Sequence, residues 1–450
     1  MSNTILITNA QVVNEGQVWH GAVLIENELI SQVYHDPFPN KPLQTAGVII
    51  DAQNSYLLPG IIDDQVHFRE PGLTHKADIG SESRAAVAGG ITSFMEMPNT
   101  IPQATTVQEL NKKFETAAQK SFANYTFYIG ATNDNLEELL KIDPRKVCGI
   151  KVFMGSSTGN MLVDKAEALE QIFSKAKTLV ATHCEDEATI QANLSRFKEQ
   201  YGDKIVPRHH PLIRNHKACY LSSSKAVELA RKFNTRLHVL HLTTAEEMAL
   251  FSNNLPLQDK LITGEVCVHH LWFSDDDYGK KGNFIKWNPA VKTSFDREQL
   301  WKSLLDGTLD VVATDHAPHL KEEKLNPYLS APSGGPLVQH SLQAMFDAIT
   351  KRSLPVHLLA RWMSHNPAIC YKVHKRGFIR EGYFADLVIL NPNEPYRVTE
   401  ENILYKCRWS PFKGHTFKST PTHTLVNGKL VFDHGIFMED FRGMPLEFDR

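Results

Sequence analysis

The sequence lacks the features that mark secreted, membrane-spanning and nucleic-acid-binding proteins. Its six cysteines are scattered with no CxxC pair, which argues against a disulfide framework or a structural zinc knuckle and suits a reducing compartment. No apolar run approaches membrane-spanning length, and the first residues have neither the basic nor the apolar region of a signal peptide. A formal net charge of −3 gives no reason to expect a nucleic-acid or membrane partner. We therefore expect a soluble, cytoplasmic protein.

Both ends of the chain have the pattern of short strands joined by turns. The chain of 450 residues is long enough for one large α/β domain and a smaller one. Strand-like patterns occur at residues 4–9, 22–26, 48–51, 385–390 and 424–431. Asn427-Gly428 between two apolar runs is a strong hairpin signal. We expect residues 1–56 and 372–450 to meet in one small β-sandwich domain.

Strand and helix patterns alternate through residues 57–371. After an opening strand that begins at residue 59, strand patterns cover residues 91–97, 125–131, 149–154, 179–183, 237–242, 262–268 and 311–314. Helical periodicity fits residues 79–88, 107–119, 165–175, 187–200, 221–233 and 297–305. Eight strands separated by helices predict a (β/α)₈ barrel, with a doubly wound open sheet as the alternative. Polar, metal-type residues at many strand ends favour the barrel, because a barrel gathers eight such ends into one pocket.

The opening strand carries the first group of candidate functional residues. Residues 59–72 begin as an apolar run and end in polar residues closed by Pro-Gly. Side chains alternate along a strand, so Asp63, Gln65 and His67 share one face, and Arg69 follows where the strand gives way to a loop. An acid, an amide and an imidazole beside a guanidinium suggest a metal site next to an anion site. The alternative is a strand end whose polar residues face solvent.

Later strands end in residues of the same chemical kinds. Lys151 stands in an apolar run, where an unpaired ammonium is costly unless it is neutralised, paired, chemically altered or able to reach solvent. His183 and His241 end successive strands. One such histidine is usually structural, but two that follow His67 favour metal ligands. Asp315, at the end of the eighth strand, suits both metal coordination and proton transfer.

Together these motifs are far more specific than any one of them. The set comprises the strings HFREPG at residues 67–72, MPNT at 97–100 and DHAPH at 315–319, with Lys151, His183 and His241 between them. The stretch at residues 377–390 has the pattern of the outer β domain of the amidohydrolase superfamily. In order and in coverage of nearly the whole chain, the sequence resembles the dihydroorotases of that superfamily.

The resemblance implies the reversible cyclisation of N-carbamoyl-L-aspartate to L-dihydroorotate plus water in pyrimidine biosynthesis. In such enzymes the lysine that matches Lys151 is carboxylated and bridges two zinc ions. The ions activate a bridging hydroxide that attacks the ring carbonyl. Asp315 would be the catalytic residue that takes the proton and delivers it to the leaving nitrogen.

The resemblance also assigns the metal ligands, with one departure. Lys151, His183 and His241 would hold the more buried ion, while His67, Asp315 and the residue at position 65 would complete the outer site. The family pattern Asp-x-His-x-His reads here with Gln65 in place of the first histidine. A neutral amide is a poorer zinc ligand than imidazole. We therefore expect one or two zinc ions, the outer one held weakly.

Substrate recognition would follow from the charge of dihydroorotate. Arg69 can bind its carboxylate bidentately, whereas the alternative role for Arg69 is an ion pair with Glu70 or Glu82. The other positions that match substrate contacts in the family are Asn99, Asn288, His319, Ser333 and Gly334. Three further residues resemble the family and would support the site from behind the ligands or serve the fold: Glu265, His269 and His270.

Two other kinds of function compete with this interpretation. Allantoinases and hydantoinase-type cyclic amidases share the barrel and the two-metal chemistry, but Arg69 and the MPNT string favour a substrate that bears a carboxylate. A non-catalytic, dihydroorotase-like scaffold subunit is supported by Gln65 alone, because a scaffold has no need of Lys151 or Asp315. The expected partner is a small-molecule substrate. Dimers are common in the family, which leaves a homodimer open by analogy.

Overall fold

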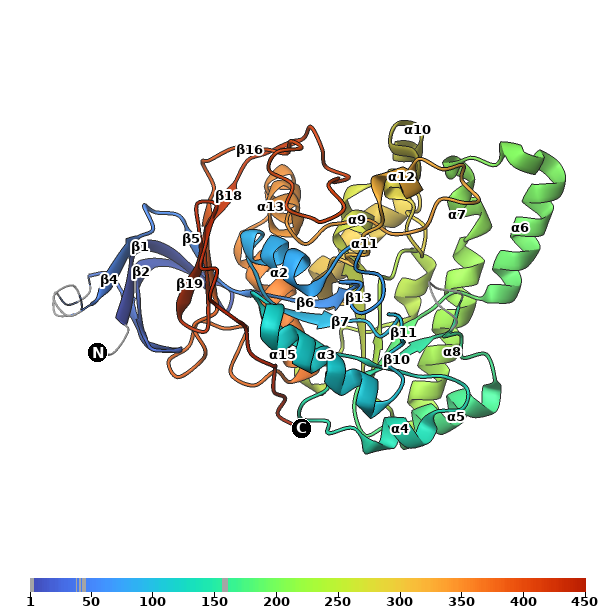
Figure 1. The fold of residues 1–450 in the computed structure, drawn as a ribbon, viewed down its shortest axis with the longest axis horizontal. Helices are drawn as coiled ribbons and strands as arrows, with labels where there is room; N and C mark the ends of the chain where they lie inside the picture. The colour runs from blue at the N-terminus through green and yellow to red at the C-terminus, as the bar shows by residue number, and fades with distance from the viewer. Residues whose placement is uncertain (1–3, 38, 40–41, 43–45, 156–160) are drawn as a thin grey trace.

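The structure is a computed structural model that describes residues 4–37, 39, 42, 46–155 and 161–450 (Figure 1). It consists of a (β/α)₈ barrel and a β-rich domain to which both ends of the chain contribute, as predicted. Within the described residues, every helix is too short or too polar to cross a bilayer.

The β-rich domain is built on one nine-stranded sheet. The N-terminal part gives β1 (Thr4–Asn14), β2 (Gln17–Glu26), β3 (Leu29–His35), β4 (Val48–Asp51) and β5 (Tyr56–Pro59), and the C-terminal part gives β15 (Leu387–Asn391), β18 (Thr420–Val426), β19 (Lys429–Asp433) and β20 (Ile436–Phe437). The two parts meet where β5 pairs antiparallel with β15, so the blue and red strands lie side by side in Figure 1. Asn427 and Gly428, both at positive φ, form the predicted hairpin turn between β18 and β19. Outside this sheet, β16 (Tyr396–Arg397) pairs with β17 (Thr416–Phe417).

The barrel has eight parallel strand positions, one of them split into two pieces. They are β6 (Ile61–Val66), β7 (Ile91–Glu96), β8 (Asn124–Phe127) continued by β9 (Ile129–Gly130), β10 (Ile150–Phe153), β11 (Val180–His183), β12 (Leu237–Val239), β13 (Ile262–Cys267) and β14 (Val311–Ala313). A parallel bridge between Val66 and His316 joins the first strand to the chain just beyond the eighth. The His67 backbone N–H also donates to the His316 carbonyl at 2.7 Å. The ring of strands is therefore closed at its C-terminal rim.

Six helices occupy the places predicted for them, within a few residues at each end. They are α2 (Ile79–Ala88), α3 (Val107–Lys120), α5 (Ala166–Lys175), α6 (Glu187–Tyr201), α8 (His216–Phe233) and α11 (Ser294–Asp306). The largest difference is at α8, which begins five residues before the predicted start. The Asn215 side chain accepts a hydrogen bond from the Ala218 N–H at 3.1 Å and caps the helix there.

Eight further helices in the described part of the chain were not predicted; most are short, whereas α13 has an apolar period that the prediction missed. They are α4 (Leu136–Lys141), α7 (His210–Ile213), α9 (Val268–Trp272), α10 (Tyr278–Lys281), α12 (Lys321–Lys324), α13 (Ser341–Lys351), α14 (His357–Ala360) and α15 (Asn366–Tyr371). A π-helical turn at Arg361–His365 joins α14 to α15. Short 3₁₀ turns lie at Gly202–Lys204, Pro207–His209, Glu246–Leu250, Leu257–Asp259, Asp275–Asp277 and Gly282–Ile285.

A buried polar network joins the barrel to the β-rich domain. The Asn124 side chain, at the start of β8, donates to Asp386 at 3.2 Å and accepts from the Asn427 side chain at 2.8 Å. Arg376 forms a buried ion pair with the same Asp386 carboxylate. Since each of these groups has a partner, the seam between the two parts is fixed by directional contacts as well as by apolar packing.

Candidate active site

One pocket lies where the barrel strands end, and it gathers almost all of the predicted site residues. Its lining includes Gln65, His67, Arg69, Asn99, Lys151, His183, His241, Asn288, Asp315, Ser333 and Gly334. His319 lines the neighbouring hollow, and its Nε2 lies 3.2 Å from Arg69 Nη2. These residues come from seven of the eight strand positions and the loops that follow them, which is the convergence that a barrel provides.

Lys151, His183 and His241 form the deeper part of the pocket. His183 Nδ1 lies 2.9 Å from His241 Nε2, and all three side chains are buried. Burial lowers the pKa of Lys151 to about 8, an effect that the nearby Asp315 carboxylate opposes. Burial also lowers the pKa of both imidazoles, and the ion-pair partner of His183, Glu185 at 3.2 Å, opposes this for His183. The two imidazoles are therefore neutral near pH 7, which is the form that binds metals.

Gln65, His67 and Asp315 meet on the other side of the pocket. Gln65 Nε2 donates to Asp315 Oδ1 at 3.1 Å, and His67 Nε2 lies 3.2 Å from the same oxygen. Burial raises the pKa of Asp315 to about 7, although the positive charge of Lys151 opposes this. His67 Nδ1 lies 2.8 Å from Asn99 Oδ1. Asn99, predicted from the sequence to contact substrate, is thus also placed to orient His67.

Arg69 is buried and lines the same pocket. It has a positive φ of 67°, and its Nε donates to the Pro318 carbonyl at 3.1 Å. Burial lowers the pKa of Arg69 to about 10, which leaves it charged near pH 7. The alternative ion pairs are not formed, because Glu70 pairs with Lys120 and Glu82 pairs with His316. No carboxylate in the described parts of the chain pairs with Arg69.

A second buried charge cluster lies beneath the pocket, and most of it was missed from the sequence. His238 Nε2 lies 3.2 Å from Asp64 Oδ2 and 3.8 Å from Glu265 Oε2. Burial alone would lower the pKa of His238, but the two carboxylates raise it to about 9. Glu265 Oε1 also accepts the His241 backbone N–H at 2.9 Å, so the cluster supports the strand end that carries His241. His238 stands three residues before His241, a spacing that places the two on opposite faces of a regular strand, so the strand-end pattern did not point to it.

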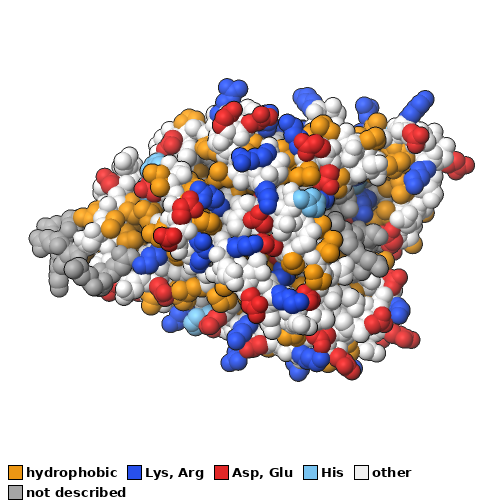
Figure 2. All heavy atoms as spheres, in the orientation of Figure 1, with side chains coloured by type: hydrophobic (Ala, Val, Ile, Leu, Met, Phe, Trp, Pro, Cys, Tyr) orange, Lys and Arg blue, Asp and Glu red, His pale blue; other side chains and the backbone are white. Residues whose placement is uncertain are grey.

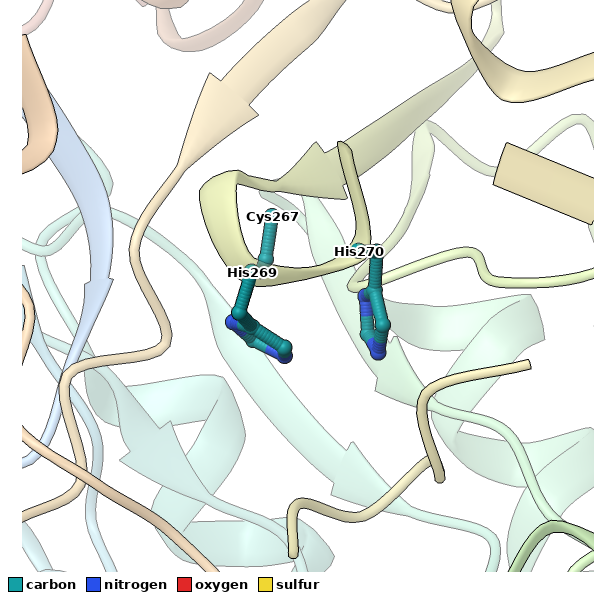
Figure 3. A group of neighbouring side chains, drawn as sticks. All are labelled: Cys267, His269 and His270. Atoms are coloured by element: carbon teal, nitrogen blue, oxygen red, sulfur yellow. The ribbon is translucent and has the colours of Figure 1, made fainter. Parts of the chain in front are cut away.

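Cys267, His269 and His270 lie at the end of β13 and in the short helix that follows, behind the pocket wall. In Figure 3 the two imidazoles extend side by side from the turn, and their ring centroids are 4.0 Å apart. His269 stacks on Trp287, a residue that lines the pocket, at 4.3 Å between ring centroids. Cys267 Sγ lies 4.0 Å from Gln65 Oε1. The three side chains therefore back the wall and do not line the pocket, which agrees with the supporting role expected for His269 and His270.

The donor set of the pocket fits a transition metal. Its lining brings together three imidazoles, one amine, one carboxylate and one amide, from His67, His183, His241, Lys151, Asp315 and Gln65. His183 Nδ1 and His241 Nε2 face each other at 2.9 Å, so these two nitrogens could both bind one ion placed between them and Lys151.

Comparisons with known proteins agree with this geometry. A family model described as the amidohydrolase family matches residues 56–431. A dihydroorotase of Methanosarcina acetivorans is 33% identical over 98% of this chain and 95% of its own length. An allantoinase of Streptomyces avermitilis is 30% identical over 86% of this chain and 87% of its own. Among solved structures, an L-hydantoinase (dihydropyrimidinase) from Arthrobacter aurescens has a TM-score of 0.89 at 24% identity, covering 97% of this chain and 98% of that one.

Proposed function

Because the chain belongs to the amidohydrolase family and is a hydrolase of cyclic amides, we propose that it is a dihydroorotase. It would interconvert N-carbamoyl-L-aspartate and L-dihydroorotate, with water released on ring closure, in pyrimidine biosynthesis. The relatives that bear this name are similar over nearly the whole chain. The observation that carries the proposal is a buried guanidinium beside the candidate metal ligands.

Arg69 distinguishes among the possible cyclic amides. A buried guanidinium without a carboxylate partner is energetically costly. We therefore infer that a bound ligand supplies the anion that pairs with Arg69. Dihydroorotate carries a carboxylate on the ring, whereas allantoin and hydantoin do not. A guanidinium can bind that planar anion with two parallel hydrogen bonds. His319, 3.2 Å from Arg69 Nη2, would help to hold the same group.

The pocket would hold zinc through the residues that converge there. Carboxylated Lys151, His183 and His241 would bind the deeper ion, and Gln65, His67 and Asp315 the outer one. When bound, such ions polarise an amide carbonyl and lower the pKa of water to near neutrality. The lowered pKa of Lys151 supports the carboxylation, because only a neutral amine reacts with carbon dioxide.

The chain's own groups would position the substrate and move the proton. Asp315, whose pKa is raised by burial to about 7, can hold a proton at its Oδ1 or release it in the same pH range. It would deliver that proton to the ring nitrogen on hydrolysis and take it back on ring closure. Asn99 would keep His67 oriented, and Asn288 and the backbone at 333–334 would contact the ring.

A side-by-side assay tests the proposal. The purified, metal-loaded protein would be given L-dihydroorotate, allantoin, hydantoin and dihydrouracil at matched concentrations, with N-carbamoyl-L-aspartate for the reverse direction. A dihydroorotase prefers the first substrate in kcat/KM and also closes the ring. Preference for an uncharged ring by tenfold or more would overturn the assignment. Light scattering on the same sample reports whether the protein is a homodimer.

Two other functions each have one supporting observation. The similarity to an allantoinase of Streptomyces avermitilis supports a cyclic amidase with another substrate. Gln65, in place of a histidine ligand, supports a non-catalytic scaffold subunit. The same assay separates them, because the first predicts turnover of allantoin and the second predicts no turnover despite a full metal content.

A further inference from the structure

The loop after α12 forms one wall of the pocket and is held by two lysines. We call residues 326–335 the pocket loop, since they include Ser333 and Gly334, which line the pocket. The Lys324 ammonium, which is buried, has three acceptors. They are the backbone carbonyl oxygens of Pro332 at 2.8 Å, Gly334 at 2.7 Å and Lys286 at 3.3 Å. All three N–H bonds of this ammonium are thus used on backbone.

Lys286 binds the other half of the same loop. Its ammonium donates to the Tyr328 carbonyl at 2.8 Å and to the Ala331 carbonyl at 2.5 Å, and it lies 4.3 Å from the centre of the Tyr328 ring. The Lys286 backbone carbonyl also accepts the Gly334 N–H at 2.8 Å. Four carbonyl oxygens of the pocket loop therefore converge on two ammonium groups that come from outside it.

The loop backbone has little freedom to take another shape. Gly334 has a φ of 125°, and a Cβ atom at that position would come within 2.4 Å of the Ala317 carbonyl oxygen. The Ser333 carbonyl lies 3.0 Å from His319 Nε2, the nitrogen that also approaches Arg69. The loop is thus packed directly on the residues that surround Arg69. Its conformation and the geometry of the anion-binding side of the pocket are linked.

The charge of the two lysines needs a separate explanation. Neutral donors could satisfy the same carbonyl oxygens at a lower desolvation cost. Both lysines are buried, and no carboxylate in the parts of the chain that the structure describes forms an ion pair with either of them. Burial lowers the pKa of Lys286 to about 8 and lowers the pKa of Lys324 well below its usual range, so neither ammonium is stabilised by a direct carboxylate partner. An anion bound beside Arg69 would favour the charged form of both lysines.

We propose that Lys286 and Lys324 are positioning residues that hold the pocket loop in its substrate-binding shape and make the pocket selective for anionic substrates. The first half concerns the loop alone. The second half rests on the proposed function, since it requires a substrate that carries a carboxylate. Neither lysine lies among the residues that line the pocket, so both act through the loop and through their charge.

Three variants and one matched control test the proposal. Lys324→Met and Lys286→Met remove the donors and the charge at nearly constant volume, while Lys324→Gln keeps donors without the charge. Lys281→Met is the control, because Lys281 also donates to a backbone carbonyl, that of Pro411 at 2.6 Å, but does not touch the pocket loop. Metal content and circular dichroism would first show that each variant is folded and loaded.

Hydrogen exchange tests whether the two lysines hold the pocket loop, and it needs no substrate. We expect amide exchange in residues 326–335 to become about tenfold faster in both methionine variants and unchanged in Lys281→Met, because lost hydrogen bonds lower the local opening free energy. Equal exchange in Lys324→Met and Lys281→Met would overturn the loop role. Should Lys324→Met not fold, Lys286→Met and Lys324→Gln carry the same comparison.

Steady-state kinetics test whether the two lysines make the pocket selective for anionic substrates. We expect KM for dihydroorotate to rise about tenfold in Lys324→Gln and Lys324→Met while kcat changes less, since ground-state binding of the anion is weakened. An unchanged KM in both variants would overturn the charge role. If the protein instead prefers uncharged rings, the proposed function fails, and the exchange experiment still decides whether the lysines hold the loop.

Discussion

Gln65 Nε2 donates a hydrogen bond to Asp315 Oδ1 at 3.1 Å, so side chains of the first and eighth strand positions are joined inside the pocket. The other end of the amide, Oε1, lies 4.0 Å from Cys267 Sγ. An imidazole at position 65 could direct a nitrogen at an ion, whereas this amide is engaged with the carboxylate that would share the ion. We therefore expect the proposed outer metal position to be the weaker one.

Metal release should reveal this difference. In the wild-type protein, mild chelation should remove the outer ion first, while the ion near His183 and His241 stays. Gln65→His should hold the second ion more tightly, because an imidazole replaces a neutral amide. The metal remaining per subunit would be counted at each chelator concentration. Identical release curves for the two proteins would show that residue 65 does not bind the metal.

Replacing Lys151 should abolish activity. Lys151→Ala removes the group that would bridge the two ions as a carbamate, and an ammonium at this place would instead repel them. Activity that returns on adding a short-chain carboxylate would support the bridging role. Full activity of the untreated variant would contradict it.

Arg69 should set substrate preference. Arg69→Met removes a charge-assisted contact worth about 1.5–3 kcal/mol, which corresponds to a loss of roughly 10- to 150-fold in kcat/KM for dihydroorotate. Arg84→Met is the control, because Arg84 pairs with Glu439 on the surface. Unchanged turnover in Arg69→Met at constant metal content would remove Arg69 from the anion site.

Metal affinity should rise with pH. Burial raises the pKa of Asp315 to about 7 and lowers that of Lys151 to about 8, so both groups hold protons below these values in the metal-free protein. An ion must displace those protons, so its apparent affinity should increase from about pH 6 to about pH 9. Titration calorimetry in two buffers of different ionisation enthalpy counts the protons released. Asp315→Asn should release fewer, and an equal count would contradict the assignment.

A buried ion pair beside the pocket should matter for stability. Lys113 Nζ lies 2.9 Å from Glu96 Oε2, and Glu96 Oε1 accepts the Phe68 N–H just before Arg69. Lys113→Met leaves a buried carboxylate unpaired and should cost about 3–5 kcal/mol in the free energy of unfolding. The double variant with Glu96→Gln should recover part of that loss. Urea denaturation of the three proteins checks this, and an additive double variant would refute the coupling.

The parts of the fold with strong local signals could be predicted from the sequence. The alternation of apolar strands with amphipathic helices gave the barrel, and Asn427-Gly428 gave the C-terminal hairpin. Helices such as α14 and α15 could not be predicted, because they are buried on many sides and lack an apolar period. The break between β8 and β9 at Tyr128 has no sequence signal either.

The candidate site could be predicted from the sequence because chemically distinctive residues stand at strand ends. That rule and the resemblance found the pocket residues, but they were silent on what lies one layer behind them. Asp64 and His238 meet only when strands far apart in the chain are closed into a barrel. The lysines that hold the pocket loop look like ordinary surface residues in the sequence. Only the structure shows that Lys324 is buried and bonded to backbone.

Because β5 pairs with β15, the sheet of the β-rich domain cannot be completed until late in synthesis. Pro59 is opposite Leu387 in the sheet, so the first strands emerge from the ribosome long before their partners exist. Until then the edge of β5 offers unpaired backbone groups to any other strand. A nascent chain in this condition is a natural client for a chaperone. We expect the barrel to fold first and the β-rich domain to be completed only when the last strands are released.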